Sequence, residues 1–255
     1  MNIDTNNIDF YNNDKVIEIN HLSKSFGNNH VLRDINLELK KGENIVILGK
    51  SGCGKSVLIK CIVGLLNFDS GLLKIFGKDI SNISRKEFDI MREKIGFVFQ
   101  SSALYDSMSV RDNLAFPLRK KTKHTKKEIQ YQIEKTLESV GLKNTIELMP
   151  SELSGGMRKR IGLARALILQ PEIILYDEPT TGLDPITAKE IINLMLEIKL
   201  NYKTSSIIIS HDMICAKLTS DKMFVLINGV FKENGKFEQL KKSNDKDVKA
   251  FFNEE

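Results

Sequence analysis

Apolar and polar residues alternate between positions 16 and 39, first at Ile17-Glu18-Ile19 and again at Ile35, Leu37 and Leu39. Alternation of this kind is typical of short strands that bury one face. The pattern therefore predicts an N-terminal antiparallel β layer.

Continuous apolar runs replace this alternation further along the chain. Residues 44–48 form one such run, which ends in glycines and precedes an apolar-rich helical stretch at 57–66. Other short runs follow at 72–75, 95–99, 173–176, 205–209 and 223–227. Helical patterns at 186–200 and 213–218 alternate with the later runs. This alternation predicts a parallel sheet covered by helices.

Strand patterns vanish between residues 101 and 165, where Ile129, Ile133 and Leu137 recur at helical spacing. We expect a helical lobe at about 101–165, inserted into an α/β core. One domain is then predicted at 15–242.

The two ends of the chain differ from this domain in composition. Residues 1–14 are rich in Asn and Asp and lack the residue order of a signal peptide, so we expect a flexible tail. Residues 243–255 carry Val248, Phe251 and Phe252 at helical spacing. This pattern predicts a terminal helix or tail that docks either on its own core or on a partner.

Composition narrows the class of protein without fixing it. The 255 residues are 41% hydrophobic and 28% charged, an ordinary globular balance. Lys and Arg exceed Asp and Glu by 38 to 33, a net charge of +5 that suits anionic ligands, and we expect no nucleic-acid partner. The three cysteines lack redox or metal-ligand spacing and favour a reducing compartment. The longest apolar runs fall far short of the roughly 20 residues that span a bilayer.

A phosphate-binding loop stands between the first apolar run and its helix. The pattern G-x-x-x-x-G-K-S is met by Gly49, Lys50, Ser51, Gly52, Cys53, Gly54, Lys55 and Ser56. Glycines let backbone N–H groups approach phosphate, Lys55 is expected to reach the β and γ phosphates, and Ser56 to bind Mg²⁺. The alternative is a structural glycine turn. With this loop the sequence predicts an α/β fold of the P-loop NTPase class with a RecA-like core.

Two carboxylates end the apolar run at 173–176. Asp177 is expected to orient Mg²⁺ or its water, and Glu178 to act on the attacking water as general base. Strand alternation would point these neighbours in opposite directions. The alternative is that the pair caps a loop or helix.

A second candidate phosphate cradle opens the helix after Leu153. Ser154 and the step Gly155-Gly156 precede a helical pattern, whose first N–H groups can bind an anion. One nucleotide hardly needs two cradles from one subunit. We therefore expect a head-to-tail pair in which Ser154 and Gly156 cover the γ phosphate lying on Lys55 of the other copy. Without the other motifs, a flexible turn explains Ser-Gly-Gly equally well.

With these motifs in this order, the chain resembles nucleotide-binding subunits of the ABC family over nearly all of its length. The resemblance implies that Phe26 stacks on adenine and that Gln100 touches Mg²⁺ or the water. It also implies that His211 contacts the γ phosphate and holds Glu178, and that Asp184 in Gly182-Leu183-Asp184 touches the partner subunit. Taken alone, Phe26 is also compatible with a core aromatic, His211 with a satisfied polar residue, and Asp184 with a helix cap.

One departure from the family pattern lies at Met157, where most members carry Gln. With Arg158-Lys159-Arg160 behind it, Met157 resembles the branch that serves bacterial lipid-asymmetry and organic-solvent-tolerance transporters. The segments Leu104 to Val110 and Ala115 to Leu118 resemble the same branch. Methionine lacks the side-chain amide of Gln, which removes a contact to the nucleotide ribose or to the facing subunit. We still expect the chain to hydrolyse ATP.

The resemblance implies an Mg²⁺-dependent ATPase that energises movement of phospholipid or another hydrophobic cargo by a separate membrane permease. Its expected partners are a second copy, integral-membrane permease subunits and a lipid-binding substrate protein on the far side of the membrane. Its expected place is the cytoplasmic face of the inner membrane, as a peripheral subunit. The alternatives are the ATPase of a transporter for a small polar solute and a non-transport ABC ATPase.

Overall fold

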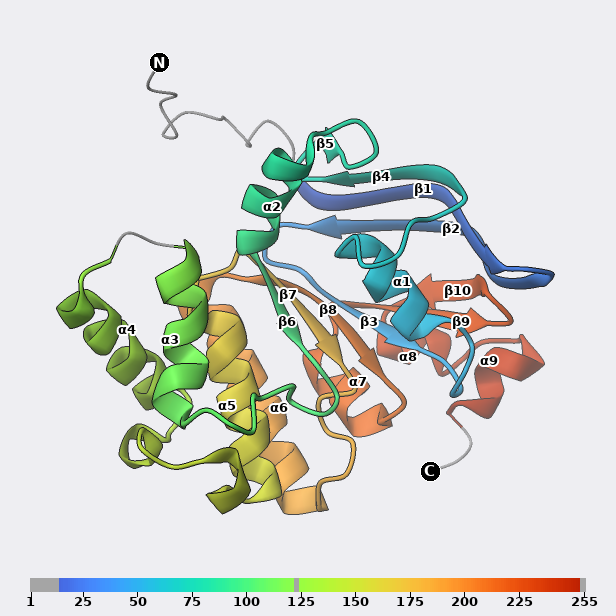
Figure 1. Ribbon diagram of the computed structural model, residues 1–255. Helices are drawn as coiled ribbons and strands as arrows, with labels where there is room; N and C mark the ends of the chain where they lie inside the picture. Colours follow the sequence, from blue (N-terminus) through green and yellow to red (C-terminus); the bar gives the residue numbers. More distant parts are fainter. Residues whose placement is uncertain (1–13, 122–123, 253–255) are drawn as a thin grey trace.

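The computed structural model describes residues 14–121 and 124–252 (Figure 1). An antiparallel sheet in the order β2, β1, β4, β5 covers one side of a six-stranded sheet (Figure 1). Its strands are β1 (Lys15–Phe26), β2 (Asn29–Lys40), β4 (Ser70–Ile75) and β5 (Lys78–Asp79). The predicted antiparallel β layer is present.

The first two strands of this layer are longer than the alternation predicted. Each has 12 residues, and together they form one hairpin in which Ile17 faces Leu39 and Ile19 faces Leu37. The register shifts several times along the hairpin, and the bulge-like positions His21 and Asp34 take φ of +53° and +54°. Each bulge resets the two-residue period, so one long strand looks like several short ones in the sequence.

The larger sheet has the order β10, β9, β3, β8, β7, β6. All neighbours are parallel except β9 and β10. The strands are β3 (Asn44–Leu48), β6 (Ile95–Val98), β7 (Ile173–Asp177), β8 (Ser205–Ser210), β9 (Lys222–Ile227) and β10 (Val230–Gly235). Helices cover one face of this sheet, and the antiparallel sheet with α1 covers the other, which explains why β3 and β8 are buried throughout.

Three neighbouring strands end at the same edge of this sheet. Leu48 pairs with Ser210, and Asp177 pairs with Ile209. The loops that follow β3, β7 and β8 therefore leave the sheet side by side. Ligands of open α/β sheets bind at this carboxyl edge.

Three helices form the predicted lobe beside the sheet: α3 (Val110–Lys121), α4 (Lys126–Ser139) and α5 (Gly155–Leu167) (Figure 1). Two 3₁₀ turns, Lys143–Thr145 and Pro150–Glu152, connect α4 to α5. The remaining helices are α1 (Lys55–Ile62), α2 (Arg85–Glu93), α6 (Pro185–Tyr202), α7 (Met213–Thr219), α8 (Phe237–Leu240) and α9 (Lys246–Ala250). Among the described helices, none has both the length and the apolar character that a membrane span requires.

The C-terminal segment docks on its own core. Val248 and Phe252 are buried, and the Phe252 ring meets Phe237 edge-on with centroids 5.4 Å apart. The predicted tail at 1–14 lies outside the described residues except for Asp14, and the predicted domain limits stay predictions.

Candidate active site

The loop of residues 49–54 joins β3 to the first turn of α1. Gly52 and Gly54 have φ of +80° and +109°, which side chains rarely adopt. A Cβ at Gly49 would lie 2.7 Å from the Leu226 carbonyl oxygen, and a Cβ at Gly54 would lie 2.9 Å from that of Val31. Since Gly54 also caps α1 without a side chain, the first-turn N–H groups of α1 are available to an anion.

Lys55 is folded back into this loop. Its side chain is buried, and Nζ donates to the carbonyl oxygens of Gly49 at 2.6 Å and Lys50 at 3.2 Å. Nζ also lies 3.7 Å from Glu178 Oε1. The ammonium group is thus held where a phosphate on the loop would meet it.

Ser56 and Asp177 bring two oxygen ligands together from α1 and β7. Ser56 Oγ lies 3.4 Å from Asp177 Oδ1. Burial raises the pKa of the Asp177 carboxyl, and the hydrogen bond from Ser56 opposes this rise. No group of three or more His, Cys, Asp or Glu side chains suited to a metal occurs among the described residues. A hydroxyl and one carboxylate fit Mg²⁺, which is held by few protein ligands together with substrate phosphates and waters.

Glu178 owes its direction to a strained backbone rather than to strand alternation. Strand β7 ends at Asp177, and Glu178 has φ of +51°. Its N–H donates to the Ile209 carbonyl at 3.0 Å. We expected strand alternation to point Asp177 and Glu178 in opposite directions. That explanation is wrong, because Glu178 lies beyond the end of β7 and has a left-handed backbone.

The Glu178 carboxylate lies between the loops after β3, β7 and β8. Its Oε2 is 2.7 Å from His211 Nδ1 and 3.2 Å from Thr181 Oγ1. An ionised carboxylate only accepts hydrogen bonds, so Nδ1 of His211 carries the hydrogen in this contact. The structure therefore brings Lys55, Asp177, Glu178 and His211 to one place.

Lys159 links the main chain of Gln100 to this cluster. Lys159 on α5 donates from Nζ to the Gln100 carbonyl at 2.6 Å and to the Glu178 carbonyl at 3.4 Å. Lys159 was not among the predicted site residues, because Arg158-Lys159-Arg160 entered the prediction only as a likeness to one branch of the family. The lysine falls on the buried side of α5, five residues after Ser154, and helical spacing was the available signal.

The second predicted cradle is built differently from the expectation. Ser154 is the N-cap of α5 and accepts a hydrogen bond from the Met157 N–H at 3.2 Å. Gly155 and Gly156 lie inside the first turn rather than before it, so the predicted start of the helix after the Gly-Gly step is wrong. A Cβ at Gly156 would lie 2.7 Å from Thr187 Cγ2, and this glycine therefore lets α5 and α6 pack closely. In Figure 1 the first turn of α5 lies well apart from the loop before α1.

The two remaining site candidates are Phe26 and Asp184. Phe26 ends β1 with 48% of its surface exposed, so the alternative of a core aromatic is wrong. The Lys24 ammonium lies 5.4 Å from its ring centroid. Asp184 caps α6, accepting hydrogen bonds from the N–H groups of Ile186 and Thr187 at 3.0 Å. A hydrogen bond from the Thr187 hydroxyl, together with these N–H bonds, lowers the pKa of the Asp184 carboxyl.

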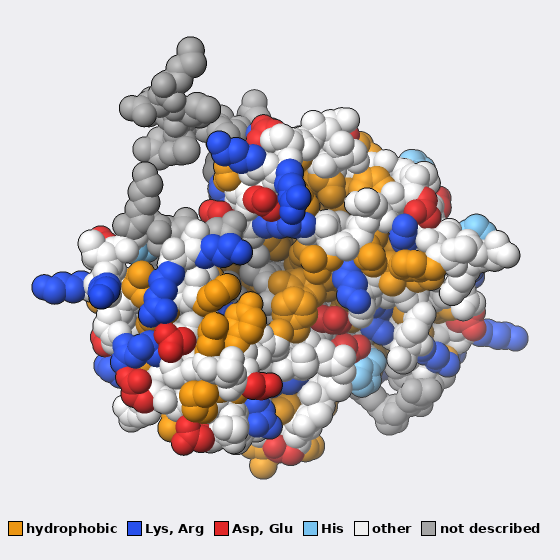
Figure 2. Space-filling view, viewed as in Figure 1, with side chains coloured by type: hydrophobic (Ala, Val, Ile, Leu, Met, Phe, Trp, Pro, Cys, Tyr) orange, Lys and Arg blue, Asp and Glu red, His pale blue; other side chains and the backbone are white. Residues whose placement is uncertain are grey.

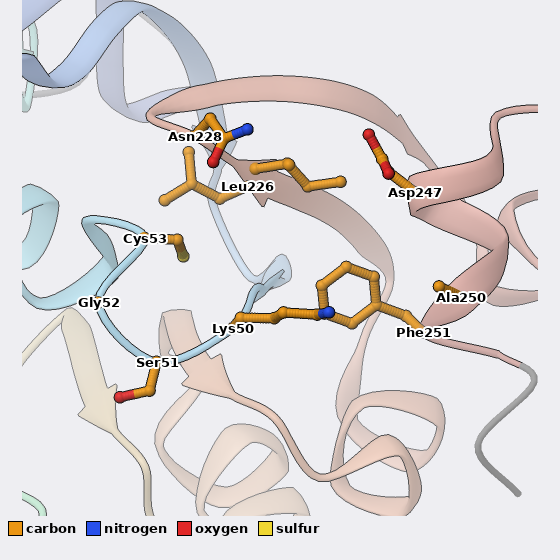
Figure 3. A pocket seen from close by; sticks show the side chains of 10 residues that line it. Lys50, Ser51, Gly52, Cys53, Leu226, Asn228, Asp247, Ala250 and Phe251 are labelled. Carbon is orange, nitrogen blue, oxygen red and sulfur yellow. The ribbon is translucent and has the colours of Figure 1, made fainter.

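A cleft of about 370 Å³ lies on the outer side of the phosphate-binding loop (Figure 3). Residues 50–53 form one wall, the turn at 226–228 a second, and Asp247, Ala250 and Phe251 of the C-terminal segment a third. Cys53 opens into this cleft and is half-buried, whereas Cys61 and Cys215 are buried.

These environments predict selective alkylation of Cys53 in the folded protein. Burial raises the pKa of all three thiols, to about 11 for Cys61 and about 12 for Cys215. Below the pKa of the Cys53 thiol, its thiolate fraction, and hence its alkylation rate, should rise about tenfold per pH unit. Intact-mass analysis after maleimide treatment should show one label, and Cys53→Ser should show none. Two or three labels before unfolding would contradict the assignment.

A buried strand, a glycine loop on a helix N-terminus and two acidic residues at the carboxyl end of β7, which β8 separates from β3, define a P-loop nucleoside triphosphatase. The sequence matches the family profile described as ABC transporter over residues 32–181. The chain belongs to this family and is its ATP-binding, Mg²⁺-dependent ATPase component.

Several relatives cover most of the chain. It is 41% identical over 93% of its length to the "Probable ribonucleotide transport ATP-binding protein mkl" of Mycobacterium leprae, and spans 68% of that protein. It is 38% identical over 94% of its length to the "Intermembrane phospholipid transport system ATP-binding protein MlaF" of Haemophilus influenzae, and spans 91% of it. It is 36% identical over 94% of its length to the "Methionine import ATP-binding protein MetN" of Campylobacter jejuni, and spans 76% of it.

Solved structures confirm the predicted fold class. The cbiO1 protein of Clostridium perfringens, part of the ABC transporter complex cbiONQ, superposes with a TM-score of 0.82 at 31% identity. That match covers 89% of this chain and 91% of cbiO1. The ATP-binding cassette MJ0796, solved as a dimer bound to ADP and Pi, superposes with a TM-score of 0.79 at 28% identity. It covers 86% of this chain and 98% of MJ0796.

Proposed function

We propose that two copies of the chain close head to tail around two ATP molecules and drive a membrane permease. The observation that carries the dimer is the separation of the α5 first turn from the loop before α1 (Figure 1). A subunit with that geometry holds its nucleotide with Lys55 and offers its Ser154 and Gly156 to a different nucleotide. The dimeric MJ0796 cassette with ADP and Pi supports this arrangement.

Each predicted site residue has a role in this arrangement. The exposed ring of Phe26 stacks on adenine, and N–H groups of residues 49–54 with Lys55 hold the phosphates. Ser56, Asp177 and Gln100 are the proposed contacts of Mg²⁺, which supplies charge neutralisation when it is bound. Asp184 contacts the facing subunit.

Glu178 is the proposed general base. His211 Nδ1 and Thr181 Oγ1 both contact Oε2, whereas Oε1 lies 3.7 Å from Lys55 Nζ. Oε1 is therefore the oxygen that faces the phosphate site and accepts a proton from water. His211 keeps the carboxylate in this orientation.

An exposed apolar face suits the permease. Figure 2 shows hydrophobic side chains gathered in the hollow between the antiparallel sheet and the helical lobe. Phe97 meets Phe99 with ring centroids 4.1 Å apart, and Tyr105 meets Phe116 at 5.4 Å. Phe99, Tyr105 and Phe116 are each about 40% exposed. Exposed aromatic surface of this kind marks an interaction site, and we assign it to an apolar segment of the permease.

Phospholipid, or another hydrophobic molecule, is the proposed cargo. The Met157 segment supports it, and the MlaF relative is matched over 91% of its own length. Relatives named for ribonucleotide transport and methionine import are 41% and 36% identical, against 38% for MlaF, so a small polar solute is the second candidate. The proposal places the chain on the cytoplasmic face of the inner membrane, with a lipid-binding protein beyond the membrane.

Purification of the tagged chain from detergent-solubilised membranes tests this function. The permease should co-purify, and mass spectrometry of the complex should find enriched phospholipid. Phe99→Asp should lower permease recovery about tenfold, since a charge would replace apolar contact in the interface. Leu200→Asp is the matched control, because Leu200 is 74% exposed at the end of α6. Methionine or nucleotide in place of lipid would overturn the cargo, and ribosomes or DNA in place of a permease would overturn transport.

A further inference from the structure

Lys159 is a buried lysine whose hydrogen-bond partners are two main-chain carbonyls of the active site. Its surface is 7% exposed. Nζ donates to the carbonyl oxygens of Gln100 and Glu178, at 2.6 and 3.4 Å. One side chain of α5 thus contacts the segment after β6 and the segment after β7.

Burial of an ammonium group is costly unless its donors are satisfied. Burial lowers the pKa of Lys159, while the nearby carboxylates of Glu178 and Asp177 oppose that shift. An apolar side chain would pack at this position without the cost of desolvation. The contacts of Nζ with Gln100 and Glu178 are therefore the reason for a lysine here.

Other residues on the same side of α5 hold the segment after Gln100. A Cβ at Gly162 would lie 3.1 Å from Ser102 Cβ, so only glycine allows this approach without a shift. Arg165 donates to the Ala103 carbonyl and lies over the Tyr105 ring at 4.6 Å. Ser102 and Ala103 both have positive φ, a conformation that needs such support. The loop after β6 and α5 are thereby joined as one unit.

Glu178 also needs support, because its φ of +51° is unfavourable for a residue with a side chain. Its N–H is held by Ile209, and its carbonyl faces Lys159. A strained residue persists only where the surrounding structure holds it in place. The Glu178 peptide is held by two elements, through Ile209 on β8 and Lys159 on α5. A shift of α5 would therefore move the peptide that aims the carboxylate.

We propose that Lys159 is a positioning residue that couples α5 to the catalytic carboxylate of its own subunit. The proposal rests on the proposed function, in which the first turn of α5 covers the partner's nucleotide. Ser154 and Lys159 lie on the same helix, so the partner's nucleotide fixes the helix that holds the peptide of Glu178.

Steady-state ATPase assays on the 255-residue chain test this role. Lys159→Met should lower kcat by about 10- to 100-fold, the loss expected when a catalytic group is slightly misplaced. KM for ATP should change less than about twofold, because Lys159 does not touch the nucleotide. Lys159→Arg should recover most of the rate, since it keeps the charge and the donors. Lys135→Met, an exposed lysine on α4, is the matched control and should match the unmodified chain.

A double variant distinguishes positioning from general destabilisation. If Lys159 acts through Glu178, Lys159→Met should change kcat less than about twofold in a Glu178→Gln background. An equal loss in both backgrounds, a loss in KM alone or an unchanged kcat would overturn the proposal. Lys55→Ala separates the two hypotheses: activity lost with Lys55→Ala but kept with Lys159→Met refutes only the role of Lys159. Activity kept with Lys55→Ala refutes the proposed function itself.

Discussion

Lys55→Ala is expected to lower kcat for ATP hydrolysis by about 10² to 10³, the loss that follows removal of one preorganised charge from an active site. Lys55 Nζ is buried inside the phosphate-binding loop, 2.6 Å from the Gly49 carbonyl. An alanine supplies no charge there, and solvent reaches a buried site too poorly to replace it. Phosphate release at saturating ATP and Mg²⁺ measures the effect.

Two controls accompany this measurement. Lys86→Ala removes an exposed lysine from α2 and should leave the rate unchanged. Lys55 also holds the loop together through two carbonyls, so its removal weakens the loop as well as the site. Thermal unfolding should show that Lys55→Ala still folds. Hydrolysis at full rate in a folded Lys55→Ala protein would contradict the assignment of residues 49–56 to phosphate binding.

The parallel core was predictable because its signals are local. Strands β3, β7 and β8 are buried almost throughout, because helices cover one face of the sheet and the antiparallel sheet with α1 covers the other. The loop at 49–54 was predictable for a similar reason, since close approach to phosphate and to Leu226 requires glycine at fixed spacing. The edge strand β10 was not predicted, because Val230–Gly235 is partly exposed and carries charged residues.

The residues that position the catalytic groups could not be predicted from the sequence. Glu178 lies beyond the end of β7, and only the packed structure shows its left-handed backbone. Helical spacing places Lys159 on the buried side of α5, but Gln100 is 59 positions away, and no local pattern predicts which distant carbonyl the lysine contacts. Side chains that touch phosphate follow motifs of fixed spacing. Side chains that position them depend on tertiary packing, which varies with each neighbour.

Glu178→Gln is the change expected to separate binding from hydrolysis. Turnover should fall by about 10² to 10⁴, the usual contribution of a positioned general base. Glutamine has nearly the same shape and still accepts from His211 Nδ1, so the pocket should keep its form. ATP affinity should stay within about threefold, because the phosphates are held by Lys55 and the loop amides rather than by the carboxylate. Phosphate release and equilibrium nucleotide binding measure the two effects.

The same variant tests dimer closure, since ATP that is not hydrolysed should accumulate in the closed pair. A ligand shifts an equilibrium only by its differential affinity, and only the closed dimer adds Ser154 and Gly156 to the contacts of each nucleotide. Size-exclusion chromatography with ATP and Mg²⁺ should therefore show Glu178→Gln as a dimer and the ADP form as a monomer. Glu197→Gln, on the exposed face of α6, should behave like the unmodified chain. Unchanged turnover would refute the role of Glu178, and a persistent monomer with ATP and Mg²⁺ would refute the head-to-tail arrangement.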